Sequence, residues 1–276
     1  MSFEDVVTDG KLRCEYDSLA EFAAAAQRRA TNRTGCKDRS DSDWTLGASF
    51  ADAVRMAGEG WTEQLDSALG LAESAIETAD KEHMTDSFNQ PVWDVTGAQV
   101  DIGAFLAGTP ECMIDYPLTE TSKVGRVITL IASISVSASV SADTIARRGR
   151  VITALALALS RLGHATELWI SNHNSVTMPE AETRIKVKGV NDELDPAVIM
   201  FAYAHPAVQR RLMFAVAEGY PGKWRRTTLM GKPMPPSVDG LPEGTIVLPE
   251  LCSDRDVPNA DEFLRKYLGE LGLLAE

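Results

Sequence analysis

Residues 127–171 constrain the fold of this chain more than any other segment. Val127 begins a mostly apolar run that carries serine at every second position from Ser133 to Ser141. Residues 142–162 have apolar residues at helical spacing, and Gly163 separates them from a second apolar stretch that ends at Ser171. A strand, a helix and a strand in this order form a parallel strand-helix-strand unit. The pattern predicts an α/β protein with a mostly parallel sheet flanked by helices.

The charge of the chain restricts its partners. The 276 residues include 27 basic and 40 acidic side chains, a formal net charge of −13. Such a charge repels a phosphate backbone through its long-range field, so we expect no nucleic-acid partner. Basic residues that stand close together are expected to form a solvated or ion-paired face. They are Arg147, Arg148 and Arg150, Arg210 and Arg211, and Lys223, Arg225 and Arg226 around Trp224.

The cysteines give no sign of a metal or of disulfide bonds. They stand at positions 14, 36, 112 and 252, without a Cys-x-x-Cys pair or a histidine at ligand spacing. We therefore expect reduced thiols, no bound metal and no cofactor. The N-terminus lacks an apolar signal region, and no apolar run approaches the ~20 residues of a membrane helix. A cytoplasmic protein without a membrane partner is expected.

Two parts are expected along the chain. Residues 1–95 have the pattern of a mainly helical region, since Ser18 and Ser49 are typical N-cap residues ahead of helices. The charged, irregular segment 80–98 marks the boundary, and residues 96–276 are expected to form the α/β domain. The further elements are predicted helices over 63–79, 101–107, 195–204 and 206–218 and from Asn259 or Asp261 to Leu271, and strands over 12–16, 112–118 and 245–249. Residues 182–188 predict a half-exposed edge or hairpin strand. The proline-rich segment 219–243 predicts a long ordered excursion or a mobile loop over the surface.

Polar side chains gather where the central strands are predicted to end. Ser133, Ser135 and Ser137 are expected on one face of the first strand, Asp143 begins the following helix, and His173 follows the second strand. Ligands of open α/β sheets bind outside the carboxyl ends of the strands, so these residues are candidates for a ligand or partner site. A half-buried strand with no site shows the same alternation, and this structural alternative stays open.

Arg148 stands within the apolar stripe of the predicted helix 142–162. It follows Ile145 by three residues and precedes Ile152 by four, which places it on the buried side. An arginine there must extend to solvent or meet a carboxylate, because an unpaired buried charge is costly. A structural salt bridge and a contact with a ligand or partner are the two interpretations. Gly149 beside it permits another backbone to approach closely.

Motifs of common reactions are missing from the sequence. It contains no Gly-x-Ser-x-Gly around a nucleophile, no Gly-x-x-x-x-Gly-Lys-Ser/Thr and no Gly-x-Gly-x-x-Gly. Covalent hydrolysis and nucleotide-dependent chemistry therefore lose support.

The pattern from 127 to 171 resembles the first half of a von Willebrand factor A-like domain. Those domains carry Asp-x-Ser-x-Ser after the first strand and coordinate a divalent cation, and the corresponding residues here are Ser133-Ile-Ser135-Val-Ser137. Residues 245–251 take the place of a later strand, near which Glu250 and Asp254 supply carboxylates. The resemblance implies an A-like or Rossmann-like plan from about residue 120 to the end. Serine in place of the leading aspartate predicts no metal, since a hard cation needs charged oxygen ligands.

The segment from Trp44 to Ala53 and the core that follows it resemble uncharacterised proteins of bacterial viruses. This resemblance implies a viral protein of the host cytoplasm or the virion. We expect a non-catalytic protein-interaction or assembly module with a protein partner or self-association. The alternative is an enzyme or small-ligand-binding protein with a polar site at the carboxyl ends of the strands.

Overall fold

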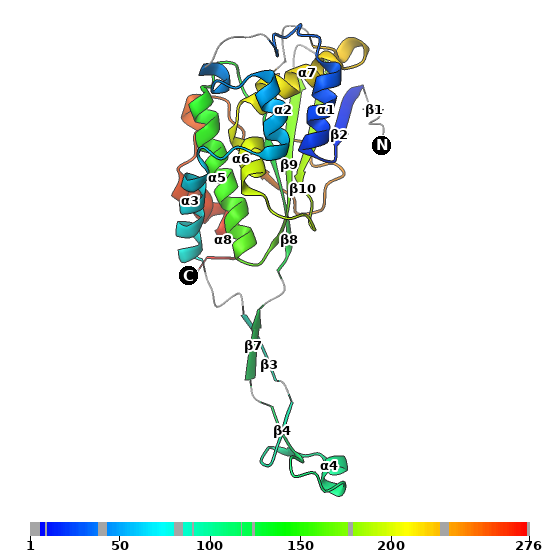
Figure 1. Ribbon diagram of the computed structural model, residues 1–276, viewed down its shortest axis with the longest axis vertical. Coiled ribbons are helices and arrows are strands. Elements are labelled where there is room, and N and C mark those ends of the chain that lie inside the picture. Colours follow the sequence, from blue (N-terminus) through cyan, green and yellow to red (C-terminus); the bar gives the residue numbers. More distant parts are fainter. Residues whose placement is uncertain are drawn as a thin grey trace.

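The computed structural model describes residues 6–8, 10–37, 43–79, 85–89, 91–116, 118–122, 125–175, 179–226 and 232–274. They form a body, built from one sheet and its covering helices, and an arm that projects away from it (Figure 1). Residues 227–231 of the predicted excursion 219–243 lie outside the described residues.

Seven strands of the described residues form the sheet of the body. They are β1 (Val6–Thr8), β2 (Lys11–Tyr16), β8 (Val127–Ser133), β9 (Ala165–Ser175), β10 (Ala181–Lys188), β11 (Lys232–Pro233) and β12 (Ile246–Leu248). The main path runs β1-β2-β10-β9-β8-β12, and β11 pairs with β9. Three of the five pairs on this path are parallel: β2–β10, β9–β8 and β8–β12. The predicted α/β fold with a mostly parallel sheet is confirmed.

The strand-helix-strand unit is present as predicted. Strands β8 and β9 are parallel neighbours, in register from Val127 opposite Ala165 to Ser133 opposite Ser171. Helix α5 (Ala142–Arg161) connects them and begins at the N-cap Ser141, whose side chain accepts a hydrogen bond from the backbone N–H of Thr144. The connection is long enough for a helical crossover, which parallel strands require.

The other body helices are α1 (Leu19–Arg29), α2 (Phe50–Glu59), α3 (Leu65–Glu77), α6 (Pro196–Ala204), α7 (Phe214–Glu218) and α8 (Ala260–Glu270). The predicted N-caps are confirmed: Ser18 accepts from the backbone N–H of Glu21, and Ser49 and Asp52 form a capping box. Between α6 and α7 the chain makes a π-helical turn over Val208–Met213. Sequence signals of helix ends were therefore sufficient for most of these elements.

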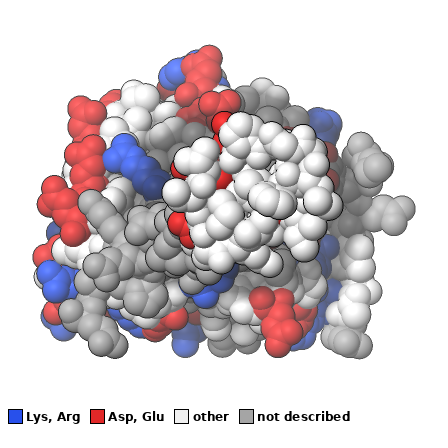
Figure 2. Space-filling model, turned by 90° about the horizontal axis from the view of Figure 1, so that it is seen from below, with Lys and Arg blue, Asp and Glu red and all other residues white. Residues whose placement is uncertain are grey.

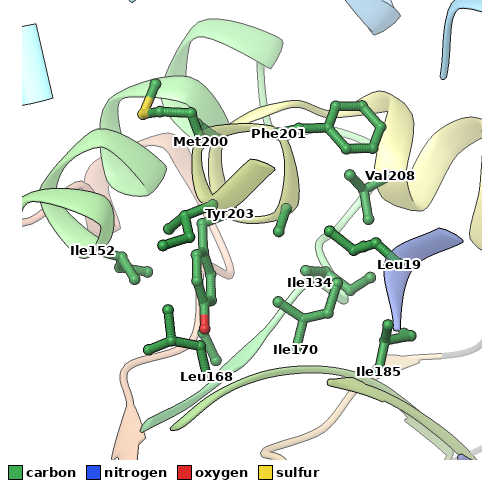
Figure 3. Packing of buried hydrophobic residues seen from close by; sticks show 14 of the residues in the cluster. Leu19, Ile134, Ile152, Leu168, Ile170, Ile185, Met200, Phe201, Tyr203 and Val208 are labelled. Atoms are coloured by element: carbon green, nitrogen blue, oxygen red, sulfur yellow. The ribbon is translucent and has the colours of Figure 1, made fainter. Parts of the chain in front are cut away.

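One face of the sheet is apolar and carries the core. Successive side chains of a strand point to opposite faces, so Leu168, Ile170 and Ile185 lie together on the face below α5 and α6 (Figure 3). All three are fully buried. Figure 3 shows Tyr203 of α6 reaching down between them and Ile152, and its hydroxyl donates to the backbone oxygen of Trp169 at 3.1 Å.

The opposite face is polar, and the segment 232–241 crosses it. The backbone N–H of Met234 donates to the His173 oxygen at 3.0 Å, and that of Ser237 donates to the Glu182 carboxylate at 3.0 Å. The prediction that 182–188 is a half-exposed edge strand is wrong, because β2 flanks β10 on one side and this segment covers its polar face. The expected hairpin pairing with β9 is confirmed.

Several arginines that were expected on a solvated face are buried. Arg210 donates to the backbone oxygens of Trp44 at 2.7 Å and Val140 at 2.6 Å. Arg211 and Arg226 likewise donate to backbone oxygens. The prediction was wrong for these residues because a guanidinium, with five N–H donors, can satisfy carbonyl groups that close packing has removed from water.

The arm begins with a two-stranded ribbon of β3 (Thr85–Asn89) and β7 (Leu118–Ser122), which are antiparallel. Beyond it β4 (Val92–Asp94), β5 (Gln99–Val100) and β6 (Met113–Asp115) form a small antiparallel sheet beside helix α4 (Ile102–Leu106). We call residues 91–116 the tip. Figure 1 shows the tip at the far end of the arm, away from the body. The expected boundary at residue 95 falls inside the tip.

Candidate functional site

The predicted serine stripe is not a feature of the strand. Strand β8 ends at Ser133, and the chain then leaves the sheet, so Ser135 and Ser137 lie in the following loop. The Ser133 hydroxyl accepts from the backbone N–H of Ser135 at 3.1 Å, and the Ser135 hydroxyl donates to Asn174. Ser137 is partly exposed, and its hydroxyl lies 3.0 Å from that of Ser139. The prediction of three serines on one strand face was wrong, because periodicity alone does not mark where pairing stops.

Arg148 lies at the same end of the sheet and is buried. Its guanidinium donates to the Ser133 oxygen at 2.9 Å and to the Pro249 oxygen at 2.6 Å. Burial lowers its pKa to about 10, so the side chain stays protonated at neutral pH. The acceptors are backbone oxygens, so the expected salt bridge to a carboxylate is wrong. Arg148 therefore links Ser133, the last residue of β8, to Pro249, which follows β12 and precedes Glu250.

Asp143 and Asp254 lie at the entrance of α5. Asp254 accepts a hydrogen bond from the backbone N–H of Ser141 at 2.9 Å. This bond is the main reason why the pKa of Asp254 is lowered. Asp143 forms an exposed ion pair with Arg147 at 2.9 Å. Glu250 is only partly buried, and its carboxylate lies 3.9 Å from the Cys252 sulfur. Each of these carboxylates has a local partner and none contacts Ser135.

His173 lies on the polar face, apart from these groups. Its Nε2 is 3.0 Å from the Glu180 carboxylate and its Nδ1 is 2.6 Å from the Pro235 oxygen. A small pocket of about 90 Å³ opens beside it. The pocket is lined by Lys11, Leu12, Arg13, His173, Glu180, Glu182, Ser237 and Asp239. The segment 232–241 supplies the last two residues, and no pattern in the sequence predicts that this segment crosses the polar face.

Two pockets lined by residues that the structure describes near the predicted site are small for a ligand site. Sites for small molecules usually occupy ~300 Å³ or more, whereas 90 Å³ holds a few water molecules. A second pocket, between Arg148 and Tyr203, measures about 20 Å³. Over the part of the chain that the structure describes, no three His, Cys, Asp or Glu side chains stand close enough to hold a metal ion.

The tip of the arm has an unusual surface. None of its 26 described residues is buried, although many are apolar. The side chains of Ile102, Phe105 and Leu106 in α4 are 69%, 62% and 79% exposed, and Trp93 in β4 is 51% exposed. We call these four residues the apolar tip face. An exposed group of large apolar side chains on a folded protein marks an interaction site.

The geometry of the tip sets how these side chains are presented. Asp101 caps α4: its Oδ1 accepts from the backbone N–H of Ala104 at 3.1 Å, and its Oδ2 from the Trp93 indole N–H at 3.0 Å. These two bonds lower the pKa of Asp101, the bond from Ala104 most. The carboxylate therefore holds Trp93 beside the start of α4. Residues 102, 105 and 106 follow the i, i+3, i+4 spacing of one helix face.

The helix predicted over 101–107 is confirmed as α4, but no site was expected among the tip residues, and residues 80–98 were expected to be a boundary. A signal was nevertheless present: from residue 84 to residue 122 the sequence has six acidic residues and no Lys, Arg or His. Figure 2, viewed from below the arm, shows a projecting white lobe with red atoms at its margin. An apolar segment whose charged residues are all acidic indicates a surface that another molecule covers.

The fold and the tip define a class: a mixed α/β body with one helix-covered sheet face, carrying a projecting arm with an apolar end. In the described part of the chain, no helix has the length and apolar character needed to cross a bilayer. The chain belongs to the DUF7192 family, a domain of unknown function, whose family model matches residues 5–275. Comparisons with curated proteins and with solved structures found no match.

Proposed function

We propose that this protein is a non-catalytic interaction or assembly module that binds another protein through the apolar tip face. One observation carries the proposal: the tip has defined strands and a helix but no buried side chain. A segment of this size cannot bury enough apolar surface by itself to offset its conformational entropy. Contact with a partner supplies the missing burial.

The shape of the tip favours a particular binding mode. Ile102, Phe105 and Leu106 project from one side of α4, the arrangement by which a short helix enters an apolar groove. Trp93, held beside them by Asp101, adds an aromatic side chain of the kind that dominates binding energy at protein interfaces. The arm keeps this face clear of the body, so a partner reaches it without a rearrangement of the core (Figure 1).

A small-ligand or catalytic role at the strand ends has less support. Ser133, Ser135 and Arg148 lie together, but their polar atoms bond to neighbouring groups of the same chain. His173 contacts Glu180 and the Pro235 oxygen instead of these groups, and the pocket beside it is small. The likeness of residues 44–53 to proteins of bacterial viruses extends the proposal: the partner belongs to a viral assembly or its host. The resemblance of residues 127–171 to von Willebrand factor A-like domains also supports the proposal of an interaction domain.

Site-specific photocrosslinking in cells that make the protein tests the proposal. A photoreactive phenylalanine is placed at Phe105, or at Glu262 on the exposed side of α8 as the control. We expect a crosslinked protein partner from position 105 and not from position 262. The partner is then purified and its Kd measured against the wild type and an Ile102→Ser, Leu106→Ser double variant.

A loss of affinity of tenfold or more in the double variant supports the proposal. Equal affinity of the variant and the wild type, or crosslinks to a protein partner only from position 262, shows that the tip is not the binding surface. Crosslinks from position 105 to another copy of this chain identify self-association instead. Light scattering of the wild type and the double variant then measures whether the tip sets the oligomeric state.

A further inference from the structure

We propose that the surface which covers the tip is an apolar groove of another protein, bordered by lysine and arginine side chains. This inference rests on the proposed function and names the chemistry of the partner. Its basis is that the tip, which carries the apolar tip face, has exposed acidic residues and no basic residue.

The charges of the tip are all negative. Residues 91–116 contain four acids, Asp94, Asp101, Glu111 and Asp115, and no Lys, Arg or His. Asp101 accepts hydrogen bonds from Ala104 and Trp93. Asp94 and Asp115 each accept one from the backbone N–H of the next residue, and both of them and Glu111 are exposed. Among the residues described in the structure, none of these three carboxylates takes part in an ion pair. An incoming surface therefore meets a tip whose exposed charged groups are all negative.

Charge complementarity selects the occupant. Opposite charges at the margin of an interface speed the encounter and favour the correct partner, and like charges there oppose binding. A lysine or arginine at the border of a groove gains an attractive interaction with Asp94, Glu111 or Asp115, while the apolar groove takes up α4. The bidentate geometry of arginine with carboxylates makes it especially suitable.

Other occupants are disfavoured by the same charges. A second tip would bring three further carboxylates against these three, and the whole chain carries a net charge of −13. Nucleic acid and the anionic surface of a membrane are negative as well. A cationic protein surface is the remaining partner that satisfies both the apolar and the charged parts of the tip.

The probe for a test is a displayed library of two-helix hairpins. The positions that line the groove between the two helices, and those at its border, are randomised over apolar, acidic, basic and neutral residues. Clones are selected on the full-length wild-type protein and counter-selected on the Ile102→Ser, Leu106→Ser variant. Binding of purified hairpins is then measured against the wild type and an Asp94→Asn, Glu111→Gln, Asp115→Asn variant at low and high salt.

We expect selected hairpins to combine apolar groove positions with basic border positions. Their affinity should fall tenfold or more for the charge-neutralised variant, and most of their salt dependence should disappear with it. Hairpins that need Ile102 and Leu106 but have neutral or acidic borders, and bind the neutralised variant equally, overturn the charge inference and leave the proposed function in place. Failure to recover any clone that distinguishes the wild type from the Ile102→Ser, Leu106→Ser variant overturns both.

Because no side chain of the tip is buried, these variants are expected to keep the unfolding midpoint of the wild type, which the experiment verifies by thermal denaturation. A change in oligomeric state between the wild type and the neutralised variant, seen by light scattering without any hairpin, would assign the tip to self-association and overturn the inference.

Discussion

A Cβ atom added to Gly149 in α5 would lie 2.2 Å from the Cα of Ala204 in α6. Real Cβ atoms do not approach backbone this closely, so the two helices touch at a point where only glycine fits. A close backbone approach at Gly149 is predicted from the sequence, and α6 is the element that approaches it.

Replacement of Gly149 by alanine should therefore destabilise the body. The added methyl forces α5 and α6 apart, and overpacking of this kind costs about 1–3 kcal/mol or more in the free energy of unfolding. Gly70 in α3 is the matched control, since a Cβ there meets nothing within 4 Å. Gly70→Ala should stabilise the protein by up to about 1 kcal/mol through helix propensity. Urea denaturation of both variants measures the difference; equal effects at the two positions would contradict the close contact.

Arg148→Met should lower the free energy of unfolding by about 2–4 kcal/mol. The substitution removes two donors and leaves the buried oxygens of Ser133 and Pro249 without these hydrogen bonds. Arg148→Lys should recover only part of the loss, because one ammonium replaces two separate N–H donors of the guanidinium. Urea denaturation at pH 7 gives the values. A Met variant as stable as the wild type would show that Arg148 does not join the two strand ends.

His205 predicts a pH dependence of stability. It is buried beside Trp61 and Phe201, and burial lowers its pKa from 6.5 to about 4. The unfolded chain therefore binds a proton near pH 6.5 that the folded protein binds only near pH 4. The contribution of His205 to the free energy of unfolding is therefore fully present above pH 6.5. It falls between pH 6.5 and pH 4, by about 3 kcal/mol in all.

The His205→Asn variant checks this assignment. Asparagine keeps an oxygen acceptor for the backbone N–H of Ala207, which donates to His205 Nδ1 at 3.2 Å. The variant should lose stability at pH 8 through poorer packing, yet show a shallower decline between pH 6.5 and pH 4. Thermal denaturation at half-unit pH steps gives both curves. Parallel curves for wild type and variant would rule out His205 as the source.

Glu218 predicts a second effect at lower pH. Burial by itself raises the pKa of this carboxyl, but hydrogen bonds from the backbone and hydroxyl groups of Thr34 and Thr31 outweigh it and lower the pKa. The stabilisation by the Glu218 carboxylate is fully present above the pKa of about 4.3 that this carboxyl has in the unfolded chain. It is lost as the pH falls through the lower pKa of the folded protein. Glu218→Gln should be less stable than wild type at pH 7, by about 1–3 kcal/mol, and the difference should shrink toward pH 3.

Removal of the arm should leave the body intact. Ser87 and Glu120 are paired in the ribbon, so an Asn-Gly turn can replace residues 88–119 and close the remaining parts of the two strands as a short hairpin. No side chain of the tip is buried, so the free energy of unfolding of the body should change by less than about 0.5 kcal/mol. A large loss of stability in urea denaturation would mean that the arm packs on the body.

The elements that local signals define were predictable. The caps at Ser18 and Ser49, the helix 142–161 and the parallel strands on either side of it follow from hydrogen-bonding side chains and apolar spacing, which act within a few residues. The N-cap Asp195 and the helix start at Pro196 follow in the same way.

The candidate site was less predictable because it depends on distant residues. Ser133 and Arg148 do lie together, yet Arg148 bonds to Pro249, which is 101 residues away. His173 was expected beside the serines, but it lies on the face that the segment 232–241 covers, opposite Pro235. A one-dimensional pattern does not encode which carbonyl a long side chain reaches once the sheet has formed.

The amino-acid sequence by itself determined the α/β class, the central strand-helix-strand unit and most helix starts, because these depend on interactions between neighbours in the chain. Only the tertiary structure decided that several arginines are buried, that a late segment closes the polar face, and that Trp93, Ile102, Phe105 and Leu106 remain uncovered at the end of an arm. Burial is a property of the packed molecule, and the same apolar residue enters a core or faces solvent according to what the rest of the chain places beside it.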